Sequence, residues 1–266
     1  MSYYEKDKEV MAVTPSVTVY NPKTFIQTAQ KAEYNMGVYS KKMLGFLGAI
    51  NVTPGPFTIF RKKVFDDLGP YQHGHNTEDM EIAYRMQKYF YKIDHCNDAL
   101  VYTNTPPTIK KLFKQRLRWI YGFLNNTIDY RDLIFKKKYG NFALFTLPTG
   151  LVSIFSVCYL FGRIFYNLGN YIYMKIVSFQ TIGFQYSFHP FNFDLFFLNT
   201  QFYFFLSLLI YSSIIFSIIF GRRMVENKWS ISKDMLYFFP VFSMIAPFWF
   251  MKAIMNTILH KKPVWK

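Results

Sequence analysis

Cysteine is scarce in this chain of 266 residues, which contains only Cys96 and Cys158. The two are isolated in the sequence, so neither a disulfide framework nor a cysteine-based metal site is expected. Acidic residues are also few, with 16 Asp and Glu against 31 Lys and Arg, which gives a net charge of +15. Such an excess of positive charge indicates an anionic partner, either a nucleic acid or a membrane surface.

Charged residues are nearly absent from three long apolar runs in the C-terminal half of the chain. The first run, Phe142 to Phe161, has none at all. Each run approaches the roughly 20 apolar residues that cross a ~30 Å hydrocarbon core, and three such runs argue against the buried helices of a soluble protein. The sequence therefore predicts an all-α transmembrane region over residues 141–266. Its predicted spans are 142–166, 195–220 and 235–258.

Basic residues gather at the ends of these runs. Lys136 to Lys138 precede the first run, Arg222 and Arg223 follow the second, and Lys261 and Lys262 follow the third. This distribution favours a lipid bilayer over a nucleic acid as the anionic partner. We therefore expect a multi-pass protein of the cell membrane, with its polar part on the cytoplasmic side and no nucleic-acid partner.

The charge pattern leaves the orientation of the third run open. Three crossings would place the C-terminal lysines outside, against the tendency of basic residues to stay inside. Either the third run folds back at Pro240 and Pro247, or the aromatic segment Tyr171 to Phe193 also enters the bilayer. The polar opening of the chain, SYYEKDKEV, predicts neither a signal peptide nor an N-terminal span.

The polar half alternates between strand-like and helical patterns, which is typical of an α/β domain. The predicted strands are Val10 to Tyr20, Phe57 to Phe60 and Ile93 to Thr103. The predicted helices are Thr24 to Tyr39, Val64 to Leu68, Glu78 to Tyr91 and Ile109 to Leu124. We expect part of an α/β domain over residues 1–104 and amphipathic interfacial helices over 105–140.

One candidate site is a loop that delivers two adjacent carboxylates, Glu78 and Asp79, to the start of a helix. In a purely structural interpretation, Asn76 or Thr77 caps this helix and the carboxylates favour the positive end of its dipole. In the functional interpretation, one carboxylate is a general base held within reach of a hydroxyl group. The loop histidines His73 and His75 lack a third ligand at helical spacing, so solvated side chains are expected rather than a metal site.

A second candidate lies on the predicted helix Ile109 to Leu124, whose apolar stripe could rest on a membrane surface. On its other face, Gln115, Arg118, Trp119 and Gly122 project together because they are spaced i, i+3, i+4 and i+7. An amide, a guanidinium and an indole so placed could hold a phosphate or a sugar ring. The alternative is that Arg118 and Trp119 only anchor the helix at the interface.

A third candidate is the segment Val52 to Phe57, in which Gly55 stands between two prolines and Arg61 follows. Glycine permits a close backbone approach and the prolines fix the neighbouring dihedral angles, so the segment suits either a ligand-lining loop or a plain structural turn.

These three pieces, in this order and followed by spans, resemble the membrane-bound family 2 glycosyltransferases typified by cellulose, chitin and hyaluronan synthases. Thr77-Glu78-Asp79 is similar to the family's T-E-D motif, and Gln115-Arg116-Leu117-Arg118-Trp119 to its Q-x-x-R-W motif. The segment Gly55 to Arg61 resembles the Gly-Ser-x-x-x-x-Arg turn at the acceptor site, with Pro56 in place of Ser. The resemblance covers about Val10 to Trp265.

The resemblance implies a transfer of sugar from a nucleotide-sugar donor to a growing polysaccharide, with inversion at the anomeric carbon. Asp79, beside Glu78, would be the catalytic carboxylate that takes a proton from the acceptor hydroxyl. The residues expected to bind donor and acceptor are Thr77, Gly55, Gln115, Arg116, Arg118 and Trp119.

The chain departs from the family's pattern at its start. The family's nucleotide-binding half carries an Asp for the uridine and a D-x-D for the metal, whereas the only Asp before Gly45 is Asp7. We therefore expect the C-terminal portion of a GT-A-like transferase, split or truncated. It would need a partner chain that carries the missing half and the ligands of the Mg or Mn ion, and it would not turn over donor alone. Two alternatives stay open: a non-catalytic membrane scaffold or polymer conduit, and a transferase that adds a single lipid-linked sugar.

Overall fold

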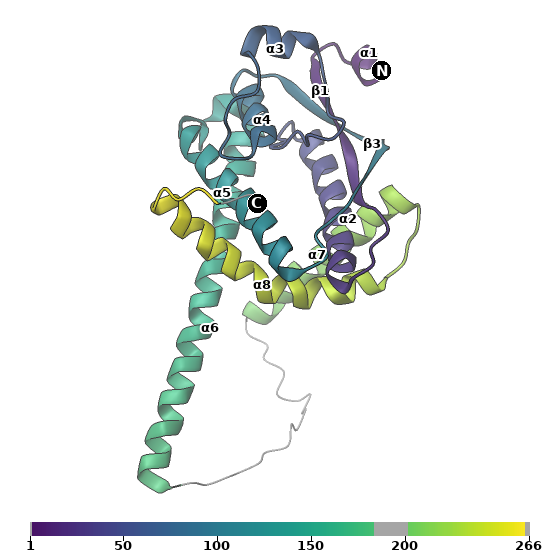
Figure 1. Cartoon of the computed structure of the whole chain (residues 1–266). Coiled ribbons are helices and arrows are strands. Elements are labelled where there is room, and N and C mark those ends of the chain that lie inside the picture. Colours follow the sequence, from purple (N-terminus) through teal and green to yellow (C-terminus); the bar gives the residue numbers. More distant parts are fainter. Residues whose placement is uncertain (1, 184–201, 264–266) are drawn as a thin grey trace.

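The apolar helices α7 (Phe202–Glu226) and α8 (Lys233–Ile258) lie against the helices of the α/β part, and α6 (Leu147–Ile182) alone extends away from it (Figure 1). The structure is a computed structural model, and it describes residues 2–183 and 202–263. A small sheet and its helices lie at one end, and the helix α6 projects from the other. The prediction of an α/β piece followed by an all-α region of membrane-type helices is confirmed.

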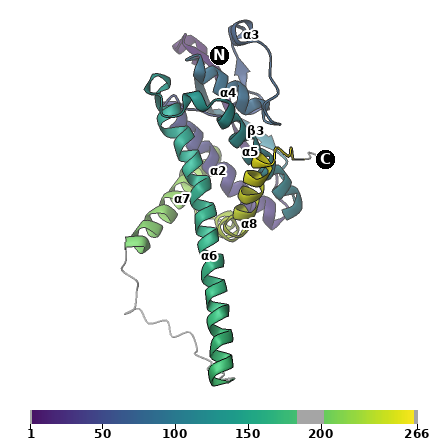
Figure 2. The ribbon, with the colours of Figure 1, turned by 90° about the vertical axis from the view of Figure 1, so that its left-hand side faces the viewer.

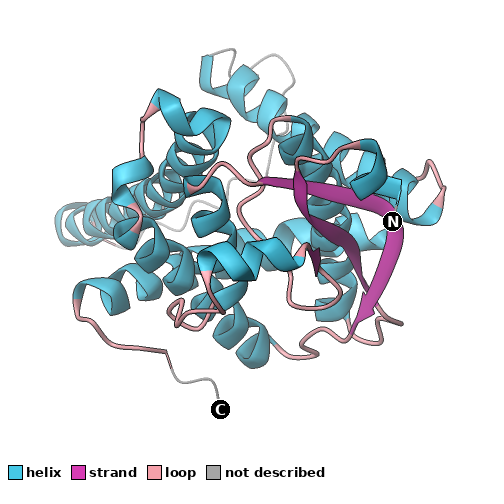
Figure 3. Ribbon diagram, turned by 90° about the horizontal axis from the view of Figure 1, so that it is seen from above, coloured by secondary structure: helices cyan, strands magenta, loops and turns pink. Residues whose placement is uncertain are grey.

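The sheet has three strands in the order β2-β1-β3. The central strand β1 (Val10–Val19) pairs in parallel with β3 (Lys92–Thr103) and antiparallel with β2 (Ile59–Phe60). The parallel register shifts between Pro15 and Ser16, where proline has no N–H to donate to the ladder. Seen from above, the strands occupy one side of the molecule and helices fill the rest (Figure 3).

The helix α2 (Phe25–Phe46) lines one side of the cavity that holds the candidate site. Thr24 and Gln27 begin it with a capping box, in which each side chain accepts a hydrogen bond from the other residue's backbone N–H. It runs past the predicted end at Tyr39 and continues through Gly45, and it ends just before Gly48, which has a φ of +62°. The shorter helices of this part are α1 (Ser2–Lys6), α3 (Lys62–Leu68) and α4 (Glu78–Lys88).

The amphipathic helix α5 (Ile109–Asp129) carries its apolar stripe toward α8 (Lys233–Ile258). Leu112 and Leu117 are buried in one cluster with Trp249 and Ala253 of α8. The sequence offered a membrane surface as the contact for this stripe. In the structure a protein helix covers it, because α8 brings an apolar face of its own to the same place.

Within the described residues, three helices are long and apolar enough to cross a membrane: Phe142–Thr181, Phe204–Glu226 and Lys233–Ile258. The first combines a π-helical turn, Phe142–Thr146, with α6 (Leu147–Ile182), and it extends beyond the predicted end at residue 166. The second is α7 (Phe202–Glu226). Residues 195–201 of the second predicted run, and 184–193 of the aromatic segment, lie outside the described residues.

The proposed fold-back at Pro240 and Pro247 is wrong, since α8 continues through both prolines as one helix. Its first half instead lies across the direction of α6, as two views at right angles show (Figures 1 and 2). Neighbouring helices can accommodate the carbonyl groups that prolines leave without a donor, and α8 packs against α2, α5 and α6.

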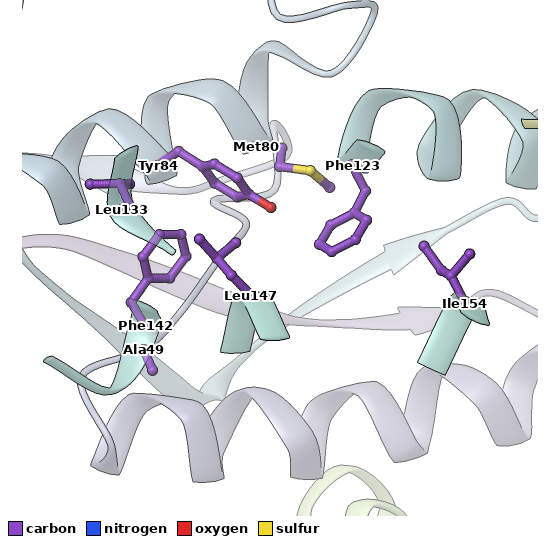
Figure 4. Packing of buried hydrophobic residues seen from close by; sticks show 8 residues of the cluster. All are labelled: Ala49, Met80, Tyr84, Phe123, Leu133, Phe142, Leu147 and Ile154. Carbon is purple, nitrogen blue, oxygen red and sulfur yellow. The ribbon is translucent and has the colours of Figure 1, made fainter. Parts of the chain in front are cut away.

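One buried cluster joins the α/β part to the first apolar helix (Figure 4). Tyr84 of α4 packs edge-to-face on Phe142, with ring centroids 5.0 Å apart, and Phe123 of α5 belongs to the same cluster. Thr146 Oγ1 also donates to the carbonyl of Ala49, at 3.1 Å. The start of the first apolar helix is therefore packed directly against the elements that carry the candidate motifs. The short 3-10 turns Arg131–Leu133 and Lys137–Tyr139 connect it to α5.

Candidate active site

Six of the eight predicted site residues line one cavity of about 450 Å³. They are Gly55, Thr77, Asp79, Gln115, Arg118 and Trp119. Sequence segments some 60 residues apart thus meet around a single hollow, whose remaining wall comes from α2 and the sheet. Glu78 and Arg116 do not line it.

Thr77 fixes the loop before α4 against α5. It occupies the N-cap position, but its side chain makes no capping hydrogen bond, so capping does not explain this residue. Its hydroxyl donates to the Gly74 carbonyl at 2.8 Å and accepts from Asn126 Nδ2 at 2.9 Å. Gly122 of α5 faces it so closely that an added Cβ would overlap the Thr77 side chain, with the Thr77 Cβ only 2.8 Å away.

Asp79 stands in the first turn of α4 and lines the cavity. The backbone is held by Thr53, whose N–H and hydroxyl both donate to the Asp79 carbonyl, at 3.1 and 2.9 Å. Burial raises the pKa of the Asp79 carboxyl, and the charge of Glu78 raises it further, while Arg118 and Lys41 oppose the shift. A carboxyl group with a raised pKa in a cavity is suited to accept a proton.

Glu78 is exposed and lies beside the cavity rather than in its wall. Its negative charge still affects the site, because it raises the pKa of Asp79 and opposes the lowering of the pKa of Arg118 by burial. The two adjacent carboxylates therefore have different surroundings, and only Asp79 is placed to meet a ligand.

The helix α5 presents Gln115, Arg118 and Trp119 to the cavity, as the helical spacing predicts. Arg118 Nη1 donates to the carbonyl of Asn76 at 2.7 Å, which ties α5 to the loop that carries Asp79. Gln115 Oε1 is buried and has no hydrogen-bond partner within the described part of the chain. It is thus an acceptor available to a ligand donor.

Arg116 turns away from the cavity and supports Trp119 from behind. It is 3% exposed, forms an ion pair with Glu33 of α2, and lies over the Trp119 ring at 4.0 Å from the centroid. The sequence grouped Arg116 with the ligand-binding residues. Its contacts instead position the indole, since the cation packs on the ring face.

The segment around Gly55 enters the cavity wall, but Arg61 does not. Arg61 Nε donates to the Val10 carbonyl at 2.7 Å, and Nη2 donates to the Tyr4 carbonyl at 2.8 Å. Arg61 therefore holds the start of β1, while Gly55 forms part of the site.

Lys41 also lines the cavity, and sequence reasoning missed it. It follows Glu33 and Gly37 on α2 at intervals of four residues, and all three face the hollow. Residues spaced i, i+4 and i+8 share one face of a helix, and this spacing was the sequence signal that could have identified Lys41.

The described residues contain no group of three or more His, Cys, Asp or Glu side chains that could hold a metal ion. His75 Nε2 instead lies 2.7 Å from Asp129 Oδ2, a pairing that links the loop to the end of α5.

Comparisons with known proteins found one family model and several relatives. Residues 2–259 match the model of the glycosyl transferase family group 2. A poly-beta-1,6-N-acetyl-D-glucosamine synthase of Staphylococcus epidermidis is 28% identical over 179 residues, which is 65% of this chain and 43% of the relative. The same enzyme of another S. epidermidis strain is 30% identical over 177 residues, with the same coverage. The same enzyme of Staphylococcus aureus (strain COL) is 28% identical over 145 residues, which is 54% of this chain and 35% of the relative. The chain thus spans less than half the length of these relatives.

Proposed function

Because the chain belongs to the glycosyl transferase family group 2, we propose that it forms the acceptor side of a membrane-bound polysaccharide synthase. The observation that carries this proposal is the cavity in which Asp79 meets Gln115, Arg118 and Trp119. The names of its relatives suggest that the sugar is N-acetylglucosamine. The donor would then be a nucleoside diphosphate sugar.

In the proposed reaction Asp79 takes the proton of an acceptor hydroxyl group as that oxygen attacks the anomeric carbon of the donor. The bond between the anomeric carbon and the phosphate oxygen breaks, and the nucleoside diphosphate leaves, so the configuration is inverted. The carboxylate is suited to this role because Thr53 fixes its backbone and the loop before α4 is locked to α5.

The other cavity residues would bind and orient the sugars. The indole of Trp119, supported by Arg116, offers a flat apolar face to a pyranose ring. Gln115 Oε1 can accept a hydrogen bond from a sugar hydroxyl or acetamido N–H, and Arg118 carries a positive charge toward a departing diphosphate. Gly55 allows the backbone to approach the acceptor closely.

We propose that the nucleotide-binding half and the ligands of any divalent cation lie outside these 266 residues, and that they can be supplied as a second chain. The chain spans less than half the length of the relatives it matches, which supports this proposal.

Joint expression provides the test of this function. Membranes that contain the chain and such a partner are expected to convert labelled UDP-N-acetylglucosamine into polymer with β-1,6 linkages, as determined by linkage analysis. Polymer formed from another nucleotide sugar instead would show that the donor is not UDP-N-acetylglucosamine. A complex that binds donor but forms no glycosidic bond would favour a scaffold or conduit instead.

The cavity is proposed to open on the cytoplasmic side of the bilayer, with α8 along the membrane surface rather than across it. Its first half lies across α6, and its apolar side chains Met244, Phe248 and Met255 are exposed. Lys261 and Lys262 then stay on the same side as Arg222 and Arg223, as the charge rule requires.

Single cysteines placed at 228 and 261, in a chain with Cys96 and Cys158 replaced by serine, test this orientation. A thiol reagent that cannot cross membranes is expected to label neither position in intact cells and both after lysis. Labelling of position 261 alone in intact cells would show that α8 crosses the bilayer.

A further inference from the structure

The cavity holds a lysine that the proposed reaction does not yet use. Lys41 reaches it from α2, and Asp79 lines the same cavity from the first turn of α4. Its ammonium group forms no ion pair or hydrogen bond with any residue that the structure describes. A half-buried cation without a protein partner is costly unless charge or ligand compensates it.

Glu33 and Arg118, two other charged residues of the cavity wall, already have partners. Glu33 is paired with Arg116, and Arg118 donates to the Asn76 carbonyl. Glu78 is exposed beside the cavity. Asp79 is thus the carboxylate of the cavity wall that is not in an ion pair within the described part of the chain.

Among the described residues of the sheet next to α2, His95 and Asp94 do not provide a negative charge that compensates Lys41. His95 of β3 is buried between the hydroxyl groups of Thr14 and Ser16, at 3.0 and 3.2 Å. Burial, with the charges of Lys41 and Lys42, lowers the pKa of His95 to about 3, so this ring is neutral. Asp94 lies by Gly45 and lines a different hollow, together with Lys42.

We propose that Lys41 is a positioning residue of the transfer reaction, whose ammonium group keeps the Asp79 carboxylate ionised and directed into the cavity. The role rests on the proposed function of Asp79 as the base. No hydrogen bond or ion pair joins the two groups within the described residues, so the lysine acts on the carboxylate through its charge across the cavity they both line. The coupling is mutual: Lys41 opposes the rise in the pKa of Asp79, and Asp79 opposes the fall in the pKa of Lys41, which burial brings to about 8.

The first measurement does not depend on activity. The purified chain in detergent is labelled with trace acetic anhydride at several pH values, and mass spectrometry gives the rate at Lys41 with Lys42 as the internal control. Lys41 is expected to titrate near pH 8. Replacing Asp79 by Asn should raise its labelling at pH 7 by about threefold or more, since the neutral amine becomes more abundant. Asp79→Glu, which keeps the charge, should not. The proposal would be overturned if the labelling rates of Lys41 and Lys42 depended on pH in the same way. It would also be overturned if Asp79→Asn left the labelling rate of Lys41 unchanged.

The second measurement uses the complete enzyme. Lys41→Met removes the cation, so the pKa of Asp79 rises and the acid limb of the rate profile should move to higher pH. Lys41→Arg should restore the wild-type profile, which a purely structural role would not predict. An unmoved acid limb in Lys41→Met would contradict the proposal. A third outcome is that the complex makes no polymer although the labelling of Lys41 responds to Asp79→Asn. That result would support the charge interaction between the two residues and refute only the proposed function.

Discussion

Replacing Asp79 by Asn is expected to lower polymer synthesis by the complete enzyme about 10²- to 10⁴-fold, the usual contribution of a general base. Asparagine has nearly the same shape but cannot take a proton. The fold should survive, because Thr53 contacts the backbone carbonyl of Asp79 rather than its side chain. The measurement is the rate of sugar incorporation at saturating donor, with donor binding measured separately.

Glu78→Gln is the matched comparison, since the neighbouring carboxylate is exposed and lies outside the cavity wall. We expect a fall of less than about tenfold. Because Glu78 raises the pKa of Asp79, removing its charge should shift the acid limb of the rate profile to lower pH. Equal losses in the two variants, or retained synthesis in Asp79→Asn, would exclude Asp79 as the base.

Gly122→Ala is expected to be the most damaging small substitution on α5. The new methyl group would overlap the buried Thr77 side chain, whose hydroxyl is held by Gly74 and Asn126. Overpacking of this kind costs about 1–3 kcal/mol of stability. The loop must also shift, and a displacement near 1 Å at a catalytic group can cost about 10²-fold in rate. Thermal unfolding in detergent and polymer synthesis measure the two effects.

Gly162→Ala in α6 provides the control, because no atom lies within 4 Å of the added methyl group. Alanine is the better helix former by about 1 kcal/mol, so stability should be unchanged or slightly higher. If both glycine variants behave alike, the close contact of Gly122 with Thr77 does not position the site.

Much of the site could be predicted from the sequence because helical spacing is a local property. Gln115, Arg118 and Trp119 face the cavity together for that reason, and the strands and helices of the polar half follow from hydrophobic periodicity. Gly122 was placed on this face, but its contact partner Thr77 lies 45 residues earlier and only the fold reveals it.

Other features depended on tertiary contacts that periodicity does not contain. Arg116 and Arg118 are two residues apart, yet only Arg118 lines the cavity, while Arg116 lies outside its wall and pairs with Glu33. Lys41 carries no motif and enters the site because α2 extends beyond its predicted end. The cover of α5 by α8 joins residues more than 100 positions apart, so the apolar stripe alone could not distinguish a helix from a bilayer.

The central claim is that this chain supplies the base and the acceptor side of a transferase whose donor side lies elsewhere. The most direct test measures incorporation of labelled UDP-N-acetylglucosamine by proteoliposomes that hold the chain alone, the partner alone, both chains, or both with Asp79→Asn. Polymer is expected only from the two wild-type chains together. Polymer from the chain alone, or from the pair that carries Asp79→Asn, would contradict it.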